Sequence, residues 1–331
     1  MNKSLKSDLI KEALERFPST PTLTIAKKLY KENPLLFTTA EEARSSIRYY
    51  RGAQGGQNKK CLQDRSFLGQ KYSSLNRLPE PLTYMKDWEP YLIPSSKILV
   101  LCDLQIPFYD MKAVMLAIKA GQEAKCDCVL LNGDLMDFFA LSFFEKNPKE
   151  RDFPMEVDAG AEFLSILREE FPKAKIIWKL GNHEERLERY LAVKAPELFD
   201  LPHISLESLF ETDKLDVDVV RDKRVLRIGH LSVLHGHEFG KSIIAPVNPA
   251  RGAYLRCKEN VVIAHHHQTS EHTENSLNGT VTSAWSIGCL CDLHPRYLPI
   301  NKWNHGFAIV EQFKNGQFQL SNRKIIGGKV Y

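Results

Sequence analysis

The stretch KILVLCD at residues 97–103 decides the fold of this chain, because a continuous apolar run stops abruptly at an aspartate. Such a run is typical of a strand that is covered on both faces. A second run, CVLLNGD at residues 128–134, ends in the same way. Residues 111–120 between them have apolar side chains at helical spacing, so the three segments predict a strand–helix–strand crossover. Its parallel strands deliver Asp103 and Asp134 to one edge of a sheet, where ligands of open α/β sheets bind.

Three further apolar runs end in side chains that bind metals or carry protons. Residues 174–180 lead into Gly181-Asn182-His183-Glu184, and a helical pattern follows over residues 184–191. A strand–glycine–helix junction aims backbone N–H groups and the positive end of a helix dipole at its mouth, which suits a phosphate. The other two runs, residues 231–234 and 261–264, end at His235-Gly236-His237 and at His265-His266-His267.

The order of these motifs indicates a site for two divalent cations that attacks a phosphate ester. Asp134 is the best candidate for a carboxylate shared between the two cations, since it offers two negative oxygens at short reach. Two cations roughly 3.5–4 Å apart can hold both the attacking and the ester oxygens of an in-line displacement. Imidazole, carboxylate and amide groups form a mixed donor set that suits Mn, Fe, Zn or Ni better than Ca.

The ordered series Asp-x-(His/Gln), Gly-Asp, Gly-Asn-His-Glu, His-Gly and His-x-His resembles the calcineurin-like metallophosphoesterase superfamily over roughly residues 95–331. The resemblance implies a four-layer α/β fold in which two mixed sheets pack face to face between helices. It implies two divalent metal ions, with Mn expected first and Fe, Zn, Ni or Mg as alternatives. It also implies that Asp103 and His267 hold the first metal, that Asp134 bridges, and that Asn182, His235 and His265 hold the second. His183 would stabilise the transition state or protonate the leaving oxygen as a general acid.

Two positions depart from the family pattern. Gln105 stands where the family usually has His, and a neutral amide oxygen is a harder and weaker donor than imidazole, so we expect weaker first-metal affinity with some tilt toward Mn or Mg. Ala264 replaces a usual Gly before the final histidines. Because residues on a strand alternate faces, the first and third of those histidines are favoured as ligands over His266.

Some residues near these motifs have alternative interpretations. His237 shares the spacing to act as the ligand in place of His235. Asp137 is either a carboxylate that orients a ligand or a helix cap for the residues that follow it. Trp303 is expected in the core or in a pocket wall, and His305 at the edge of the site.

The cysteines and the first twenty residues indicate the cellular compartment of the protein. Seven cysteines include two C-x-C pairs, at 126–128 and 289–291, which we interpret as buried small hydrophobes rather than zinc ligands. An odd count without a regular framework predicts reduced thiols in the cytoplasm. The first twenty residues are too rich in charge for a secretory signal, and no apolar run is long enough to span a membrane.

Residues 1–55 read as a separate helical module. Residues 1–60 contain 12 Lys and Arg against 6 Asp and Glu, whereas the whole chain has a net charge of only +4. Amphipathic segments begin near residues 4 and 22, and Thr39-Ala40-Glu41-Glu42 opens a third helix with a capping-box pattern. Three short helices resemble a helix-turn-helix unit, which would contact DNA or RNA through an arginine face. The alternative is a packing module with solvated arginines. The candidate contacts are Arg44, Arg48 and Arg51.

Residues 56–93 are expected to form a linker, because glycines and polar residues give way to several prolines. Residues 94–331 are expected to form the catalytic domain. The leading function is hydrolysis of a phosphodiester in nucleic acid or in a nucleotide. The alternatives are a phosphomonoesterase, for example a phosphoprotein phosphatase, and a non-catalytic metal-binding scaffold, because fold alone does not separate them.

Overall fold

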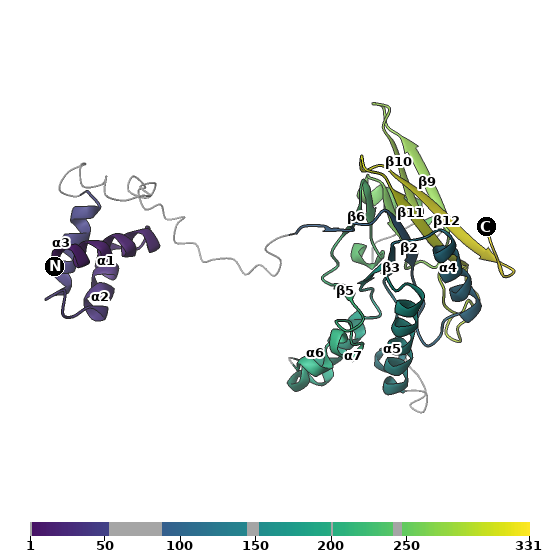
Figure 1. The fold of residues 1–331 in the computed structure, drawn as a ribbon, viewed down its shortest axis with the longest axis horizontal. Helices are drawn as coiled ribbons and strands as arrows, with labels where there is room; N and C mark the ends of the chain where they lie inside the picture. The colour runs from purple at the N-terminus through teal and green to yellow at the C-terminus, as the bar shows by residue number, and fades with distance from the viewer. Residues whose placement is uncertain (1, 53–87, 144–151, 200, 241–246) are drawn as a thin grey trace. The chain divides into compact units, whose positions relative to one another are not determined.

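The computed structural model describes residues 2–52, 88–143, 152–199, 201–240 and 247–331. The chain divides into two compact units, residues 1–86 and 87–331 (Figure 1). Strand β1 (Tyr91–Leu92) already pairs with β6 (Leu226–Ile228), so residues that were expected at the end of the linker belong to a sheet. The predicted linker up to residue 87 lies outside the described residues.

The larger unit contains a mixed seven-stranded sheet. Four neighbouring strands of this sheet are parallel, and three of them are the strands predicted from the apolar runs at residues 97, 128 and 174. The runs become strands because every residue of the second and four of five in each of the others are buried. In spatial order the strands are β13 (Lys329–Val330), β12 (Phe318–Ile326), β11 (His305–Gln312), β2 (Lys97–Leu101), β3 (Cys128–Asn132), β4 (Lys175–Lys179) and β5 (Val217–Val220).

A second, six-stranded sheet completes the scaffold. Its strands β7 and β8 run parallel to each other and are the remaining two predicted strands, which bring the histidine motifs to one edge of this sheet. In spatial order the sheet comprises β1, β6 (Leu226–Ile228), β7 (Leu231–Val233), β8 (Val261–Ile263), β10 (Val281–Ser286) and β9 (Ser270–Asn275).

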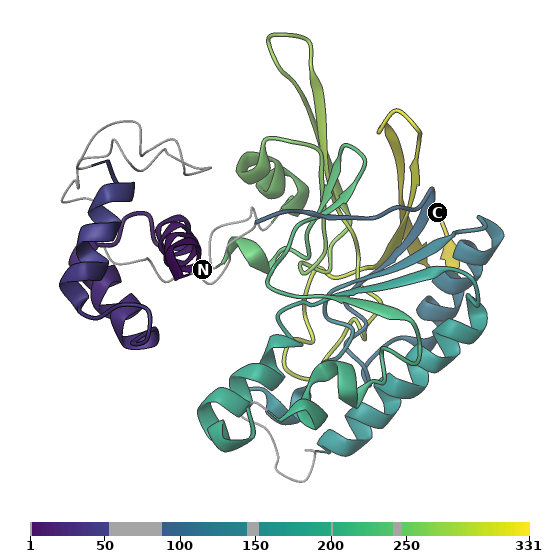
Figure 2. The ribbon, with the colours of Figure 1, turned by 60° about the vertical axis from the view of Figure 1, so that its left-hand side comes forward.

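The two sheets pack face to face between helices, which confirms the four-layer fold. One buried cluster joins Val100, Leu130 and Ile177 of the seven-stranded sheet to Val233 and Val262 of the other. Figures 1 and 2 show the helices outside this sandwich. A second buried cluster packs helices α4, α5, α6 and α7 on the outer face of the seven-stranded sheet. A third packs helix α8 on the outer face of the six-stranded sheet. The helices are α4 (Met111–Glu123), α5 (Phe153–Glu170), α6 (Glu185–Lys194), α7 (Leu206–Leu209) and α8 (Pro249–Cys257), with 3-10 turns at Phe139–Leu141, Pro196–Leu198, Pro202–Ile204 and His237–Phe239.

The described part of the smaller unit, residues 2–52, contains three helices, α1 (Asn2–Arg16), α2 (Thr22–Glu32) and α3 (Ala40–Tyr50), around a buried cluster of its own. The Thr39 hydroxyl accepts a hydrogen bond from the Glu42 amide, as the capping box predicts. The Glu42 carboxylate, however, accepts from the backbone and hydroxyl of Thr38 and not from Thr39. Seven residues separate α2 from α3, whereas a helix-turn-helix usually has a turn of about three or four. Within the described residues, no helix is both long and apolar enough to cross a membrane.

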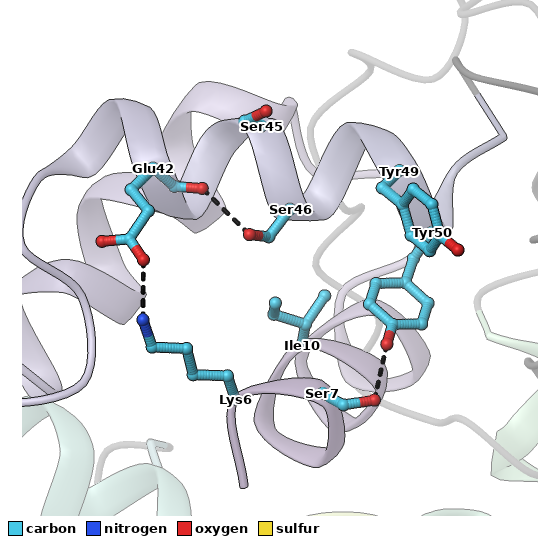
Figure 3. A pocket seen from close by; sticks show the side chains of 8 residues that line it. All are labelled: Lys6, Ser7, Ile10, Glu42, Ser45, Ser46, Tyr49 and Tyr50. Carbon is cyan, nitrogen blue, oxygen red and sulfur yellow. Dashed lines mark hydrogen bonds and ion pairs between the residues drawn. The ribbon is translucent and has the colours of Figure 1, made fainter. Parts of the chain in front are cut away.

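A shallow pocket between α1 and α3 is lined by side chains that largely satisfy one another (Figure 3). Lys6 forms an ion pair with Glu42 at 2.6 Å, and the Ser7 hydroxyl lies 2.5 Å from the Tyr50 hydroxyl. The Ser46 hydroxyl donates to the backbone carbonyl of Glu42. The Lys6–Glu42 and Ser7–Tyr50 contacts therefore join α1 to α3.

We expect Gly160→Ala in α5 to lower the thermal stability of the larger unit. A Cβ there would lie 2.5 Å from Met136 Sδ and 2.6 Å from Phe210 Cε1, and both side chains are fully buried. Alanine gains about 1 kcal/mol in helix propensity, but overpacking costs about 1–3 kcal/mol. The net loss is then up to about 2 kcal/mol, measured by calorimetry. Asp158→Ala, on the exposed face of the same helix, is the control, and an unchanged or raised melting temperature for Gly160→Ala would contradict this packing.

Candidate active site

The predicted ligands lie directly beyond strand ends, on backbone that is unusual for their residue types. Non-glycine residues rarely adopt positive φ, and each such residue costs on the order of 1–3 kcal/mol unless its surroundings enforce it. Such conformations are concentrated at functional sites. Among the predicted ligands, five have φ between 50° and 64°: Asp103, Gln105, Asp134, His265 and His267.

A first group of these side chains gathers around Asp103, at the end of β2. His267 Nε2 lies 3.1 Å from Asp103 Oδ1, and the side-chain amide of Gln105 lies 3.4 Å from the same ring nitrogen. The other carboxylate oxygen of Asp103 accepts a hydrogen bond from the backbone amide of His265. The side chains of Asp103, Gln105 and His267 are buried, and the Trp303 ring packs on His267 with centroids 4.1 Å apart. Trp303 is thus part of the wall of the site.

A second group centres on Asp134, at the end of β3. His235 Nε2 lies 3.3 Å from Asp134 Oδ2, and ligand atoms of Asp134, His235 and His265 all lie within 4.8 Å of one another. The carboxylates come from the seven-stranded sheet and the histidines from the six-stranded sheet. This second group therefore brings together residues that are up to 131 positions apart in sequence.

The backbone orients His235 so that one ring nitrogen faces the carboxylates. Its Nδ1 donates a hydrogen bond to the Asn132 carbonyl at 2.8 Å, which leaves Nε2 directed at Asp134. Burial alone would lower the pKa of His235, but Asp134 and Asp103 raise it to about 10. Positive charge is therefore strongly favoured at the Nε2 position, whether a proton or a metal cation supplies it.

Several ligand atoms in the site are buried without a hydrogen-bond partner among the described residues. They belong to three different loops: Asp103 Oδ1, Asn182 Oδ1 and His235 Nε2. An unsatisfied buried polar atom typically costs about 1–3 kcal/mol. A carboxylate oxygen, an amide oxygen and an imidazole nitrogen are suitable donors for a mixed N/O metal site. The residues present therefore fit the metals that the sequence implies.

Glu184 holds the loops of the site in place. Its carboxylate accepts hydrogen bonds from three backbone amides, those of Asp134, Met136 and Gly181, at 2.7–3.0 Å. Burial, together with the Asp134 carboxylate, raises the pKa of Glu184 to about 7. Gly181 must be glycine here, because a Cβ would lie 2.2 Å from Asp134 Oδ1. The role of Glu184 was missed from sequence, although its place directly after the Gly-Asn-His series was a usable signal.

His183 lies beside the metal candidates and contacts an arginine that the sequence analysis missed. Arg186 donates to His183 Nε2 at 2.8 Å and to Asp137 Oδ1 at 2.6 Å. Burial lowers the pKa of His183, and Arg186 adds to that effect against the opposing influence of Asp134. The imidazole is accordingly neutral, and its Nε2 lies 3.7 Å from Asp134 Oδ2. Phe138, not Asp137, occupies the cap position of the following 3-10 turn, so the helix-cap interpretation of Asp137 is wrong. Asp137 instead forms an ion pair with Arg186.

The geometry also separates the remaining histidines. His237 Nε2 pairs with Glu185 at 2.9 Å, so this side chain is engaged away from Asp134 while His235 faces it. The triplet at residues 265–267 lies beyond the end of β8, and so the predicted alternation of strand faces does not apply there. His265 and His267 reach the site through left-handed backbone instead. His305 Nε2 lies within hydrogen-bond distance of the Cys291 carbonyl, at 2.9 Å.

A buried ion pair between Lys179 and Glu238 stabilises the loop that carries His235. Glu238 accepts hydrogen bonds from the backbone amides of His235 and Gly236, and Lys179 Nζ lies 2.9 Å from the Glu238 carboxylate. Burial alone would raise the pKa of Glu238, but Lys179 and His237 hold it at about 2. Neither Lys179 nor Glu238 was singled out from sequence, since a lysine inside an apolar strand gives no sign of its partner.

Comparison with known proteins places this geometry in a family. Residues 96–296 match the calcineurin-like phosphoesterase family. The Gene 54 proteins of Mycobacterium phages L5 and D29 are each 30% identical to the chain over 230 and 229 residues, which cover 65% of this chain and 89% of each phage protein.

Solved structures with similarity to the chain have lower identity. Vacuolar protein sorting 29 from Cryptosporidium parvum is 15% identical, with a TM-score of 0.38 over 72% of this chain and 95% of that one. The E. coli phosphoesterase Yfce is 12% identical, with a TM-score of 0.31 over 68% of this chain and 98% of that one. The family match covers most of the larger unit and contains the strand-end motifs, and we conclude that this chain belongs to the calcineurin-like phosphoesterase family.

Proposed function

We propose that the chain is a two-metal phosphoesterase that hydrolyses a phosphodiester in nucleic acid or in a nucleotide. The observation that carries the proposal is the convergence of buried carboxylate, amide and imidazole ligand atoms from both sheets, around Asp103 and Asp134. Two buried carboxylates so close to a group of nitrogen and oxygen donors need compensating positive charge. When bound, two divalent cations polarise the phosphate ester and supply hydroxide near neutral pH.

The proposed roles follow the positions of the side chains. Asp103 and His267, with Gln105, would hold the first cation, and Asn182, His235 and His265 the second, with Asp134 between them. Gln105 contributes a weaker donor than imidazole, which favours Mn or Mg at the first position. The neutral His183, fixed by Arg186, would contact the phosphate or the leaving oxygen.

We propose further that the smaller unit binds nucleic acid, which would favour a nuclease over a phosphoprotein phosphatase. Arg48 is exposed on α3, and Arg44 lies on the same helix, paired at 3.2 Å with the exposed Glu41. Arg51 instead donates to Thr22 Oγ1 and to the carbonyls of Pro18 and Thr20, so it fastens α3 to the loop before α2. The proposal is therefore carried by Arg44 and Arg48, together with the excess of basic residues in this part of the sequence.

Asp134→Asn should remove metal and activity together, because the amide loses the charge that a bridging ligand needs. Metal content would be measured by mass spectrometry, and turnover with Mn on bis(p-nitrophenyl) phosphate, which the wild type should hydrolyse faster than the monoester. We expect a loss beyond about 100-fold, larger than the loss of an outer ligand partner usually causes. The exposed Asp213→Asn is the control. Full turnover by Asp134→Asn would exclude the bridging role, and a wild type that prefers the monoester would exclude a diesterase.

His183→Ala should lower turnover by about 10²–10⁴-fold while the metal content stays near the wild-type value, because the side chain lies beside the ligand groups without being one of them. His203→Ala, which removes an exposed imidazole, should leave both quantities unchanged. A His183→Ala protein that loses its metal would show instead that this ring is a ligand.

Arg44→Glu/Arg48→Glu should weaken binding of the full chain to labelled duplex DNA by at least about tenfold. The slope of log affinity against log salt concentration should also fall by about one for each phosphate group that the variant no longer reaches. Fluorescence anisotropy across a salt series measures both. Lys27→Glu/Lys31→Glu makes the same charge change on the exposed side of α2. Equal weakening in the two variants would mean that net charge alone acts, and absence of wild-type binding to duplex and single strands would refute the nucleic-acid proposal.

A further inference from the structure

A cluster of thiols lies behind the first group of ligands and is not used by the proposed hydrolysis. Cys289 and Cys291 are buried free thiols, and with His267 they place three ligand atoms within 4.8 Å of one another. The two cysteines form the second C-x-C pair of the sequence, which the sequence analysis interprets as small hydrophobes. The structure shows them facing an imidazole, a feature that spacing alone did not reveal.

The spacing within the cluster matches that of a tetrahedral metal site. Zinc binds thiolate sulfur at about 2.3 Å and imidazole nitrogen at about 2.0–2.1 Å, so sulfur and nitrogen on one tetrahedral edge lie about 3.6 Å apart. Cys291 Sγ lies 3.7 Å from His267 Nδ1. The thiols have only weak competing contacts, since the hydrogen bond from Cys289 Sγ to the Asn304 carbonyl is itself 3.7 Å long.

We propose that Cys289, Cys291 and His267 form a further site for a thiophilic divalent cation of the zinc class, which shares His267 with the proposed first-metal ligands. Two thiolates and one imidazole select soft or borderline cations such as Zn²⁺ over Mn²⁺ or Mg²⁺. The proposed phosphoesterase ligands are nitrogen and oxygen donors, so the two kinds of site differ in chemistry. The proposal does not depend on phosphoester hydrolysis by the chain.

The two nitrogens of His267 keep the sites apart. Nε2 faces Asp103 at 3.1 Å, whereas Nδ1 faces Cys291. Binding of a cation at the thiols releases the two thiol protons and the Nδ1 proton to solvent, while Nε2 keeps its proton toward Asp103. With the first phosphoesterase cation also bound at Nε2, the ring would release that second N–H proton as well and bridge the two cations as an imidazolate. The bound cation would join the segment at residues 289–291 to the end of the histidine triplet.

The other C-x-C pair provides an internal comparison. Cys126 and Cys128 have the same spacing, and Cys128 is fully buried in β3. Among the described residues, that pair belongs to no group of three potential metal ligands. A difference between the two pairs would therefore depend on the third ligand, His267, and not on the C-x-C spacing.

The test is titration of the reduced full-length protein with Co²⁺, which gives an intense near-ultraviolet charge-transfer band only when thiolates ligate it. We expect the band to saturate at one equivalent, to disappear in Cys289→Ser/Cys291→Ser, and to persist in Cys126→Ser. Circular dichroism checks that each variant is folded. X-ray absorption of the wild type with one equivalent of Zn²⁺ requires no variant, and should show two sulfur neighbours at about 2.3 Å.

Each outcome either supports the thiol site or overturns it. A wild-type band that disappears with the two serines and is kept in Cys126→Ser supports the site, as does zinc–sulfur scattering if the double variant fails to fold. A reduced wild type without the band, a band that survives in the double variant, or zinc surrounded by nitrogen and oxygen alone overturns it. Because the readouts are spectroscopic, an inactive protein leaves the interpretation unaffected.

Discussion

Two buried carboxylates impose the constraint on which the rest of the larger unit depends. Asp103 and Asp134 are 0% and 1% exposed, and each is held in a left-handed conformation at the end of a strand. Burial disfavours the charged form of each group, yet His267 beside Asp103 and His235 beside Asp134 keep the pKa values of both carboxyls below their ordinary value. A pair of like charges in this position is tolerated only where cationic groups or metal ions surround it.

The surroundings of these carboxylates are correspondingly rigid. Glu184 collects three backbone amides from two loops, and Glu238 fixes two amides of a third loop while Lys179 neutralises it. Asn132 supports the same loop by donating to the Leu234 carbonyl and accepting from His235. Preorganised loops of this kind hold ligands within the narrow geometry that a metal site requires.

The strands could be predicted from the pattern of apolar residues, whereas contacts between side chains that are distant in sequence could not. Strands β2, β3 and β4 were found within a residue or two because a strand buried on both faces reads as an apolar run. The strand-end aspartates and histidines followed from those ends. By contrast, the approach of Arg186 to His183, and of Cys291 to His267, depends on how distant segments pack. The alternation of strand faces could not be applied to the histidine triplet, because the triplet lies past the end of β8. Arg51, expected to contact nucleic acid, instead donates hydrogen bonds to backbone carbonyls within its own unit.

The donors that surround Asp134 belong to two different sheets, which also meet through an apolar interface. A cation held by both would act as a cross-link between the layers of the sandwich, so affinity for that cation and adhesion of the sheets would be thermodynamically linked. By this reciprocity, a change in the apolar interface far from any ligand, for example at Val100 or Val262, would alter cation affinity. The apolar residues between the two sheets would therefore influence cation binding although none of them is a ligand.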